Sequence, residues 1–210
     1  MIEYLQTAPV ASVIFALTIL TSVMALSNQN LYANMILHPY SVSRGSRVYT
    51  VITSGFIHAD WMHLFFNMMS YYFFAFQLEQ DLGHWQFGLL YMASLILSDL
   101  PTVQKHKNDE WYHSLGASGA VSAVIFSAIM FAPFNTMMIM PIPIPMYSIV
   151  FGILYLVYCH FASKHARDNI NHDAHFFGAL SGIIITLILN PHLAHTFIEQ
   201  VTSKVQSLLH

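Results

Sequence analysis

The longest stretch of this chain without a charged side chain runs from Trp111 to Ser163, 53 residues with no Asp, Glu, Lys or Arg. Only 8% of the 210 residues are charged and 56% are hydrophobic, whereas a soluble domain carries roughly 25% charged residues. One crossing of a bilayer takes ~20 apolar residues, so this stretch can hold two crossings. The sequence therefore predicts an integral, multi-pass membrane protein.

The apolar segments predict six spans, at approximately 8–27, 62–79, 85–100, 115–134, 144–162 and 173–191. Pro141, Pro143 and Pro145 keep the fifth from starting before about 144. Backbone groups inside lipid must pair within their own segment, which favours helices, and the alternation typical of a membrane barrel is missing. We expect an all-α, six-helix membrane domain over residues 1–192. A short tail over 193–210 has apolar residues at helical spacing, which indicates a helix on the membrane surface.

Charge and cysteine content exclude other classes of protein. The net charge is −3 and no basic block is present, so nucleic-acid binding has no electrostatic basis. The single cysteine excludes an intramolecular disulfide framework. The first apolar segment lacks the basic start and the cleavage pattern of a signal peptide, so we interpret it as a retained span.

Three polar side chains are predicted to meet near one face of the membrane. His63, Ser118 and His175 lie near the beginnings of the second, fourth and sixth predicted spans, and these three spans all start on the same side. Asn67 follows His63 by four residues and so lies one turn deeper on the same face. Polar groups inside a membrane are costly, which makes these residues candidates for function.

The chemistry that fits these side chains is nucleophilic attack by a serine. Ser118 would attack, and a neutral His175 would take its proton and later return it to a leaving amine. The developing oxyanion would receive hydrogen bonds from the Ser118 backbone N–H at a helix start, the His63 ring and the Asn67 amide. Asp173 points to another helical face than His175, so we expect a dyad without an acid. This chemistry requires no metal and no cofactor.

Small residues predict close packing of the fourth and sixth spans. Gly119, Ala123 and Ser127 form one stripe, and Gly178 and Gly182 form another. Such stripes let helix backbones approach each other in membranes, and here the approach would set the distance from serine to histidine.

With these motifs the chain resembles the rhomboid intramembrane serine proteases. The family's GxSG serine motif is present as Gly116-Ala117-Ser118-Gly119, and its AHxxGxxxG motif runs from Ala174 to Gly182. The segment from His58 to Asn67 is similar to the family's second-span motif, with His63 and Asn67 at its oxyanion positions.

Two further segments resemble the family's motifs more weakly, and two positions depart from them. Glu79-Gln80-Asp81-Leu82-Gly83 resembles the family's ExxLG turn, and Arg47 matches the arginine of its first-loop WR motif, in which Ser46 replaces the tryptophan. Ser122 stands where many members place an aromatic ring against the catalytic histidine. The resemblance therefore does not identify an aromatic ring that would stack on His175.

The resemblance implies an outward-facing active site, substrates with a single transmembrane segment, and a location in the bilayer of the inner membrane of a prokaryote. With the amino terminus in the cytoplasm, six of seven basic residues fall outside, which opposes the positive-inside rule. These six are Arg44, Arg47, Lys105, Lys107, Lys164 and Arg167. We give the resemblance precedence over this charge count.

The alternatives to this assignment are three other functions and one other base. A rhomboid-like binding module would recognise membrane segments without cutting them. A histidine-rich metalloenzyme would use His172 with His175, or His58 with His63, as ligands. Lys164 could replace His175 as the base. Transport finds no support, because no duplicated or discontinuous helix pair is evident.

Overall fold

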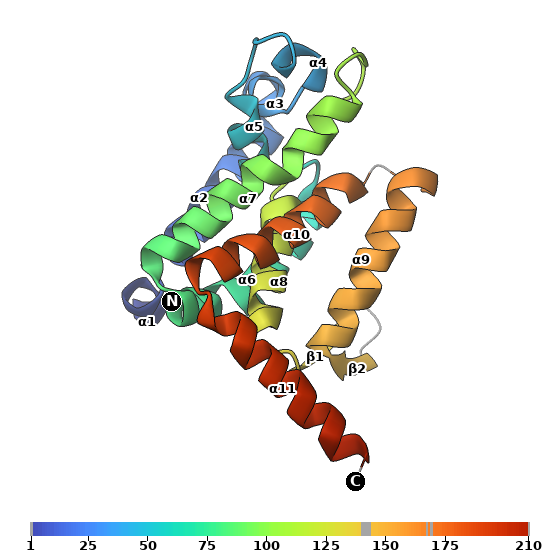
Figure 1. Ribbon diagram of the computed structural model, residues 1–210. Helices are drawn as coiled ribbons and strands as arrows, with labels where there is room; N and C mark the ends of the chain where they lie inside the picture. Colours follow the sequence, from blue (N-terminus) through green and yellow to red (C-terminus); the bar gives the residue numbers. More distant parts are fainter. Residues whose placement is uncertain (1, 140–143, 167, 169, 210) are drawn as a thin grey trace.

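The computed structural model describes residues 2–139, 144–166, 168 and 170–209, and Figure 1 shows a bundle of long helices. Pro141, Pro143 and Arg167, which entered the sequence predictions, lie outside the described residues. The chain opens with the short helix α1 (Ile2–Thr7) and closes with α11 (His192–Leu209), which extends away from the bundle in Figure 1.

Each of the six predicted segments is occupied mainly by one helix. These helices are α2 (Pro9–Ser27), α6 (Trp61–Leu82), α7 (His84–Lys105), α8 (Ser118–Phe131), α9 (Ser148–His165) and α10 (His172–Leu189). Among the described residues, α2, α7 and α10 are long and apolar enough to cross a membrane, and α8 is a shorter apolar helix of 14 residues. Six crossings therefore remain a prediction.

A short hairpin corrects the predicted start of the fifth segment. Residues Ile144–Tyr147 form strand β2, which pairs antiparallel with β1 (Thr136–Ile139), so the mostly helical chain also contains one small two-stranded sheet. Pro145 cannot donate a backbone hydrogen bond, and it favours an extended residue before it. Helix α9 begins only at Ser148, whose N–H donates to the Asn135 carbonyl at 2.9 Å.

The link between the first two long helices is built from short helical turns. These are α3 (Gln29–Met35), α4 (Pro39–Val42), α5 (Thr50–Thr53) and the 3₁₀ turn η1 (Ser54–Phe56). Leu37 and Ser114 exchange two backbone hydrogen bonds of 3.0 Å and so attach this link to the segment that precedes α8.

The last turn of α6 fixes the amino end of α2 through one buried carboxylate. Glu79 is fully buried and accepts hydrogen bonds from the N–H groups of Val10 at 3.1 Å and Ala11 at 2.5 Å. The His84 Nδ1 atom lies 2.6 Å from the same carboxylate. An anion at a helix start satisfies amides that have no intrahelical acceptor. The ExxLG-like turn thus has a structural role in joining α2, α6 and α7.

Helix α8 lies inside the bundle, and its most extensive contact is with α10. A methyl group on Gly178 would meet the backbone of Gly119, and one on Gly182 would lie 2.6 Å from the Ala123 Cα atom. Deeper along the same interface, the Thr186 hydroxyl donates to Ser127 Oγ at 2.6 Å. The two small-residue stripes therefore face each other, and the helix backbones touch.

Candidate active site at the start of α8

The segment that leads into α8 passes through Gly116, a position that only glycine suits. Its φ is +115°, and a Cβ atom there would lie 2.7 Å from Cε1 of the His63 ring. Its N–H donates to the Ser54 carbonyl at 2.9 Å. The histidine of α6 therefore lies directly against the loop that carries Ser118.

A second histidine, His58, also contacts this loop. This residue is fully buried, and its Nδ1 atom lies 2.9 Å from Ser22 Oγ, which itself donates to the Phe56 carbonyl at 3.0 Å. Because the serine proton is used in that bond, we assign the imidazole proton to Nδ1. The Nε2 atom is then an acceptor for the Ala117 N–H at 3.5 Å. His58 thus fixes the residue before Ser118.

The tautomer of His63 follows in the same way. Asp60 caps α6 by accepting the His63 N–H at 2.8 Å, which fixes the first turn of this helix. The His63 Nδ1 atom accepts the Ala59 N–H at 3.4 Å, so the ring proton belongs on Nε2, beside Gly116. One hydrogen of the Asn67 amide bonds the His63 carbonyl at 3.0 Å, which leaves the second hydrogen for another acceptor.

Ser118 and His175 flank the place where α8 and α10 come together. Ser118 is the first residue of α8, so its N–H has no acceptor within the helix. A Cβ atom on the adjacent Gly119 would lie 3.4 Å from the carbonyl of Ala174, the neighbour of His175. Among the described residues, no hydrogen bond joins the Ser118 hydroxyl to the His175 ring. Catalytic hydrogen bonds are often long in ligand-free enzymes and shorten when substrate binds.

An aromatic ring supports His175, and it comes from α9 instead of α8. The rings of Tyr155 and His175 are nearly parallel, at 16°, with centroids 6.3 Å apart. The Tyr155 hydroxyl lies 3.0 Å from Ser122 Oγ, so the small residue at position 122 makes room for this ring and hydrogen bonds with it. Sequence reasoning missed Tyr155. The only available signal was that Ser122 follows Ser118 by one turn and so faces the same side.

A second imidazole borders His175. His172 lies edge-on to it, with centroids 6.1 Å apart, and its Nε2 atom lies 3.1 Å from the Asp168 carboxylate. The pKa of Asp168 is lowered, mainly because the Ile170 N–H donates to it and also through His172. Asp173 pairs with Lys105 at 2.5 Å. In the described part of the chain, no carboxylate bonds to His175.

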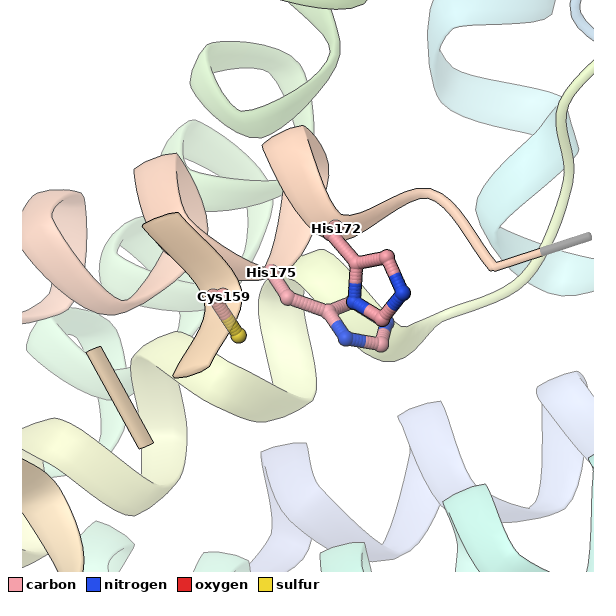
Figure 2. A group of neighbouring side chains, drawn as sticks. All are labelled: Cys159, His172 and His175. Atoms are coloured by element: carbon pink, nitrogen blue, oxygen red, sulfur yellow. The ribbon is translucent and has the colours of Figure 1, made fainter. Parts of the chain in front are cut away.

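One group of side chains at this site has the composition of a metal site. Figure 2 shows Cys159 of α9 beside His172 and His175 of α10, and their donor atoms all lie within 4.8 Å of one another. The rings of His58 and His63 are also adjacent, 4.9 Å apart, but both His58 nitrogens have hydrogen-bond partners.

The remaining candidates lie elsewhere. Lys164 is exposed at the end of α9 and bonds to His160 at 3.2 Å, and among the described residues no hydrogen bond links it to Ser118. Around the loop that leads into α8, Ser54, His58 and Ser114 are buried. His113 is exposed and stacks on His38 with centroids 4.6 Å apart.

Comparison with known proteins places the chain in a family. The family model for the Rhomboid domain matches residues 45–192, more than half of the chain. The chain therefore belongs to the rhomboid family, which confirms the resemblance inferred from its motifs. With its long apolar helices, it is an integral membrane protein.

Two curated relatives are similar over much of the chain. One is a protein of Bacillus subtilis (strain 168) with the provisional name rhomboid protease YdcA, 31% identical over 66% of this chain and 65% of its own length. The other is the mitochondrial RHOMBOID-like protein 12 of Arabidopsis thaliana, 26% identical over 72% of this chain and 49% of its own length. The chain thus spans about half to two thirds of these relatives.

Proposed function

We propose that this protein is an intramembrane serine endopeptidase that uses a Ser118–His175 dyad to cleave transmembrane segments of membrane proteins. The observation that supports this most strongly is the junction of three helix starts. His63 of α6 lies against Gly116, two residues before Ser118, and Gly119 of α8 packs beside Ala174, one residue before His175. These two contacts support a site at which His63, Asn67, Ser118 and His175 act together.

In the proposed reaction, the Ser118 oxygen attacks the carbonyl carbon of a peptide bond while its proton passes to His175. His175 then returns this proton to the leaving amine as the carbon–nitrogen bond breaks, which leaves an acyl ester on Ser118. Water attacks the ester in the second half of the reaction, again with His175 as base, and releases the new carboxyl group. Tyr155 and His172 keep the imidazole in position.

The oxyanion formed in each half would bind the donors gathered at the same loop. These are the Ser118 N–H, the Nε2–H of His63 and the unbonded hydrogen of the Asn67 amide. Removal of one such donor costs about 10²–10³ in kcat, or roughly 2.7–4 kcal/mol. We expect His63→Ala to show a loss of this size with a nearly unchanged KM.

The proposed substrates are proteins with a single transmembrane segment, presented in the lipid bilayer to the domain over residues 1–192. A helix hides its carbonyl groups in hydrogen bonds, so cleavage favours segments with residues that weaken a helix, such as Gly and Pro. By similarity to the family, the proposed location is the inner membrane of a prokaryote, with the site near its outer face.

Cleavage by purified protein in lipid vesicles tests this function. Wild-type protein should cut a reconstituted single-span substrate and react with a fluorophosphonate, and Ser118→Ala should do neither. Ser127→Ala is the matched control, because it removes a hydroxyl from the same helix deeper in the α8–α10 interface. Labelling that persists in Ser118→Ala would refute the assigned nucleophile.

An unreactive Ser118 would instead favour the rhomboid-like binding module. Substrate co-purification without cleavage would then be the expected finding. Full cleavage by His175→Ala would redirect the role of base to another group such as Lys164. Loss of cleavage on treatment with a chelator would favour the metalloenzyme.

A further inference from the structure

The donor atoms of Cys159, His172 and His175 form a group with the ligand chemistry of a transition-metal site. They lie within 4.8 Å of one another, and Cys159 and His172 are buried. The two histidines are three residues apart on α10, so they face the same side of that helix, and Cys159 approaches from α9 (Figure 2). Cys159 is the only cysteine of the chain, so no disulfide competes for it.

The two ring nitrogens of His172 differ in their surroundings. Its Nε2 atom lies 3.1 and 3.2 Å from the two Asp168 oxygens and therefore carries the proton. The opposite atom, Nδ1, is buried and has no hydrogen-bond partner in the described part of the chain, and His172 is only 4% exposed. An acceptor buried without a donor is costly, and native proteins rarely leave one.

The arrangement of Asp168, His172 and the free Nδ1 atom matches the surroundings of a metal ligand. Histidines that bind metals almost always donate their second ring N–H to a carboxylate or carbonyl, which fixes the tautomer and makes the ligating nitrogen more basic. Asp168 supplies this carboxylate to His172, and it is partly exposed, as a residue at the rim of the site is expected to be.

The ligand set selects Zn²⁺ over the common oxygen-preferring ions. One thiolate and two imidazoles suit zinc, whereas Mg²⁺ and Ca²⁺ require oxygen ligands, and this group offers none directly. Tetrahedral zinc at 2.0–2.3 Å from each ligand needs donors roughly 3.5 Å apart. Side-chain rotation over about 1 Å closes the present spacing. The thiol proton leaves to solvent on binding, and water fills the fourth position.

A pocket reaches one member of this group, His172. A small polar pocket of about 100 Å³ is lined by residues from the end of α7 and the start of α10, among them Lys105, Asn171, His172 and Asp173. The segment between α9 and α10, which carries Asp168, borders it. A hydrated cation can therefore approach His172 without crossing the apolar interior.

We propose that Zn²⁺ binds to Cys159, His172 and His175 and reversibly inhibits the enzyme by occupying its base. The inhibitory part rests on the proposed function, because only a base at His175 makes metal binding there inhibitory. This zinc is a regulator and takes no part in the reaction. The sequence predicted no metal, because Cys159 enters the group only through the packing of α9 on α10.

Metal binding is tested first without reference to activity. Purified Ser118→Ala protein in detergent should bind one Zn²⁺, and Co²⁺ in its place should give a thiolate-to-cobalt absorption band. Cys159→Ser in the same background should abolish the band. Asp168→Asn should weaken zinc binding by about 10–100-fold, because the supporting carboxylate is lost. His160→Ala is the control, since it removes an exposed histidine next to Cys159. Absence of binding, or a band unaffected by Cys159→Ser, would overturn the site.

Inhibition is tested next in vesicles with a transmembrane substrate. Zinc should reduce wild-type cleavage at least tenfold and a chelator should restore it. Each variant is compared with its own metal-free rate. Cys159→Ser should need about 10–100-fold more zinc for half inhibition, and His160→Ala should behave as wild type. Cleavage that zinc does not affect would refute the inhibition while leaving the protease proposal intact. If the protein binds zinc but never cleaves a substrate, the proposed zinc site stands and the proposed protease function is refuted.

Discussion

At the scale of single residues, the support of His175 by Tyr155 gives a test of positioning. Tyr155→Ala removes the parallel ring and should lower kcat about two- to tenfold with little change in KM, because an aromatic pair contributes about 0.5–1.5 kcal/mol. Tyr155→Phe keeps the ring and loses only the hydroxyl, with its hydrogen bonds to Ser122 and Cys159, so it should restore most of the rate. Cleavage kinetics in vesicles measure both variants. An equally large loss in the phenylalanine variant would show that the hydroxyl matters, and not the stacked ring.

Gly116 offers a second test at this scale, because a methyl group there would collide with His63. Gly116→Ala adds backbone strain of about 1–3 kcal/mol at positive φ and displaces the ring that we propose as an oxyanion donor. We expect kcat to fall by about 10²–10³. Gly45 also has a positive φ, +75°, but nothing lies within 4 Å of its missing Cβ. Gly45→Ala should therefore share the strain and keep the activity. Equal activity of both variants would contradict the proposed role of His63.

The candidate site was partly readable from the sequence. Ser118, His175, His63 and Asn67 could be named because they stand at fixed spacings within their own helices, where periodicity determines which face a residue occupies. Tyr155 and its neighbour Cys159 could not be found in this way. Their place depends on how α9 is rotated against α10, which tertiary packing sets and no local pattern records.

At the scale of helices, the contact between α8 and α10 sets the distance between nucleophile and base. Gly178→Ala would place a methyl group 2.8 Å from the Gly119 carbonyl carbon, a backbone atom that cannot move aside without moving the helix. We expect a loss of about 1–3 kcal/mol of stability through overpacking. The cleavage rate should fall by more than the loss of folded protein accounts for, because the methyl group would push Ser118 and His175 apart. Thermal unfolding in detergent and cleavage rates check the two effects.

Gly88→Ala is the matched control for this helix contact. Its Cβ atom would lie 3.4 Å from a Val10 methyl group, an ordinary contact distance, and alanine favours a helix by about 1 kcal/mol over glycine. We expect unchanged or higher stability and unchanged cleavage. If Gly178→Ala behaved like Gly88→Ala, the stripe would not control the geometry of the site.

The helices themselves were more predictable than their connections. All six apolar segments contain a helix, because hydrophobic length and the need to satisfy backbone groups in lipid point the same way. The turns α3 to α5 and the β1–β2 hairpin were not foreseen. Thr53, for example, donates its hydroxyl to the Met35 carbonyl at 3.0 Å, a contact between segments that no periodic pattern encodes.

At the scale of the whole molecule, the two ends of the bundle differ in the connections that they carry. The link built from α3, α4 and α5 packs beside the segment that follows α7, and α11 extends from the opposite end in Figure 1. Arg44 belongs to the first of these ends: it bonds the Lys107 carbonyl at 2.7 Å and lies over the Tyr40 ring at 3.5 Å. This end holds most of the basic residues. Because cytoplasmic loops are usually rich in Lys and Arg, the charge count alone predicts that it faces the cytoplasm. The resemblance to the family predicts instead that this end lies outside.

Labelling of single cysteines decides between these two orientations. In a Cys159→Ser background, Asn108→Cys and Ser203→Cys each introduce one exposed thiol, the first after α7 and the second on α11. If the site faces outward, a membrane-impermeant maleimide should label Asn108→Cys in intact cells and Ser203→Cys only after permeabilisation. Labelling in the reverse order would mean that basic residues set the topology as usual. Ser118 would then be reached from the cytoplasm, and the proposed substrates would have to present their cleaved segment on that side.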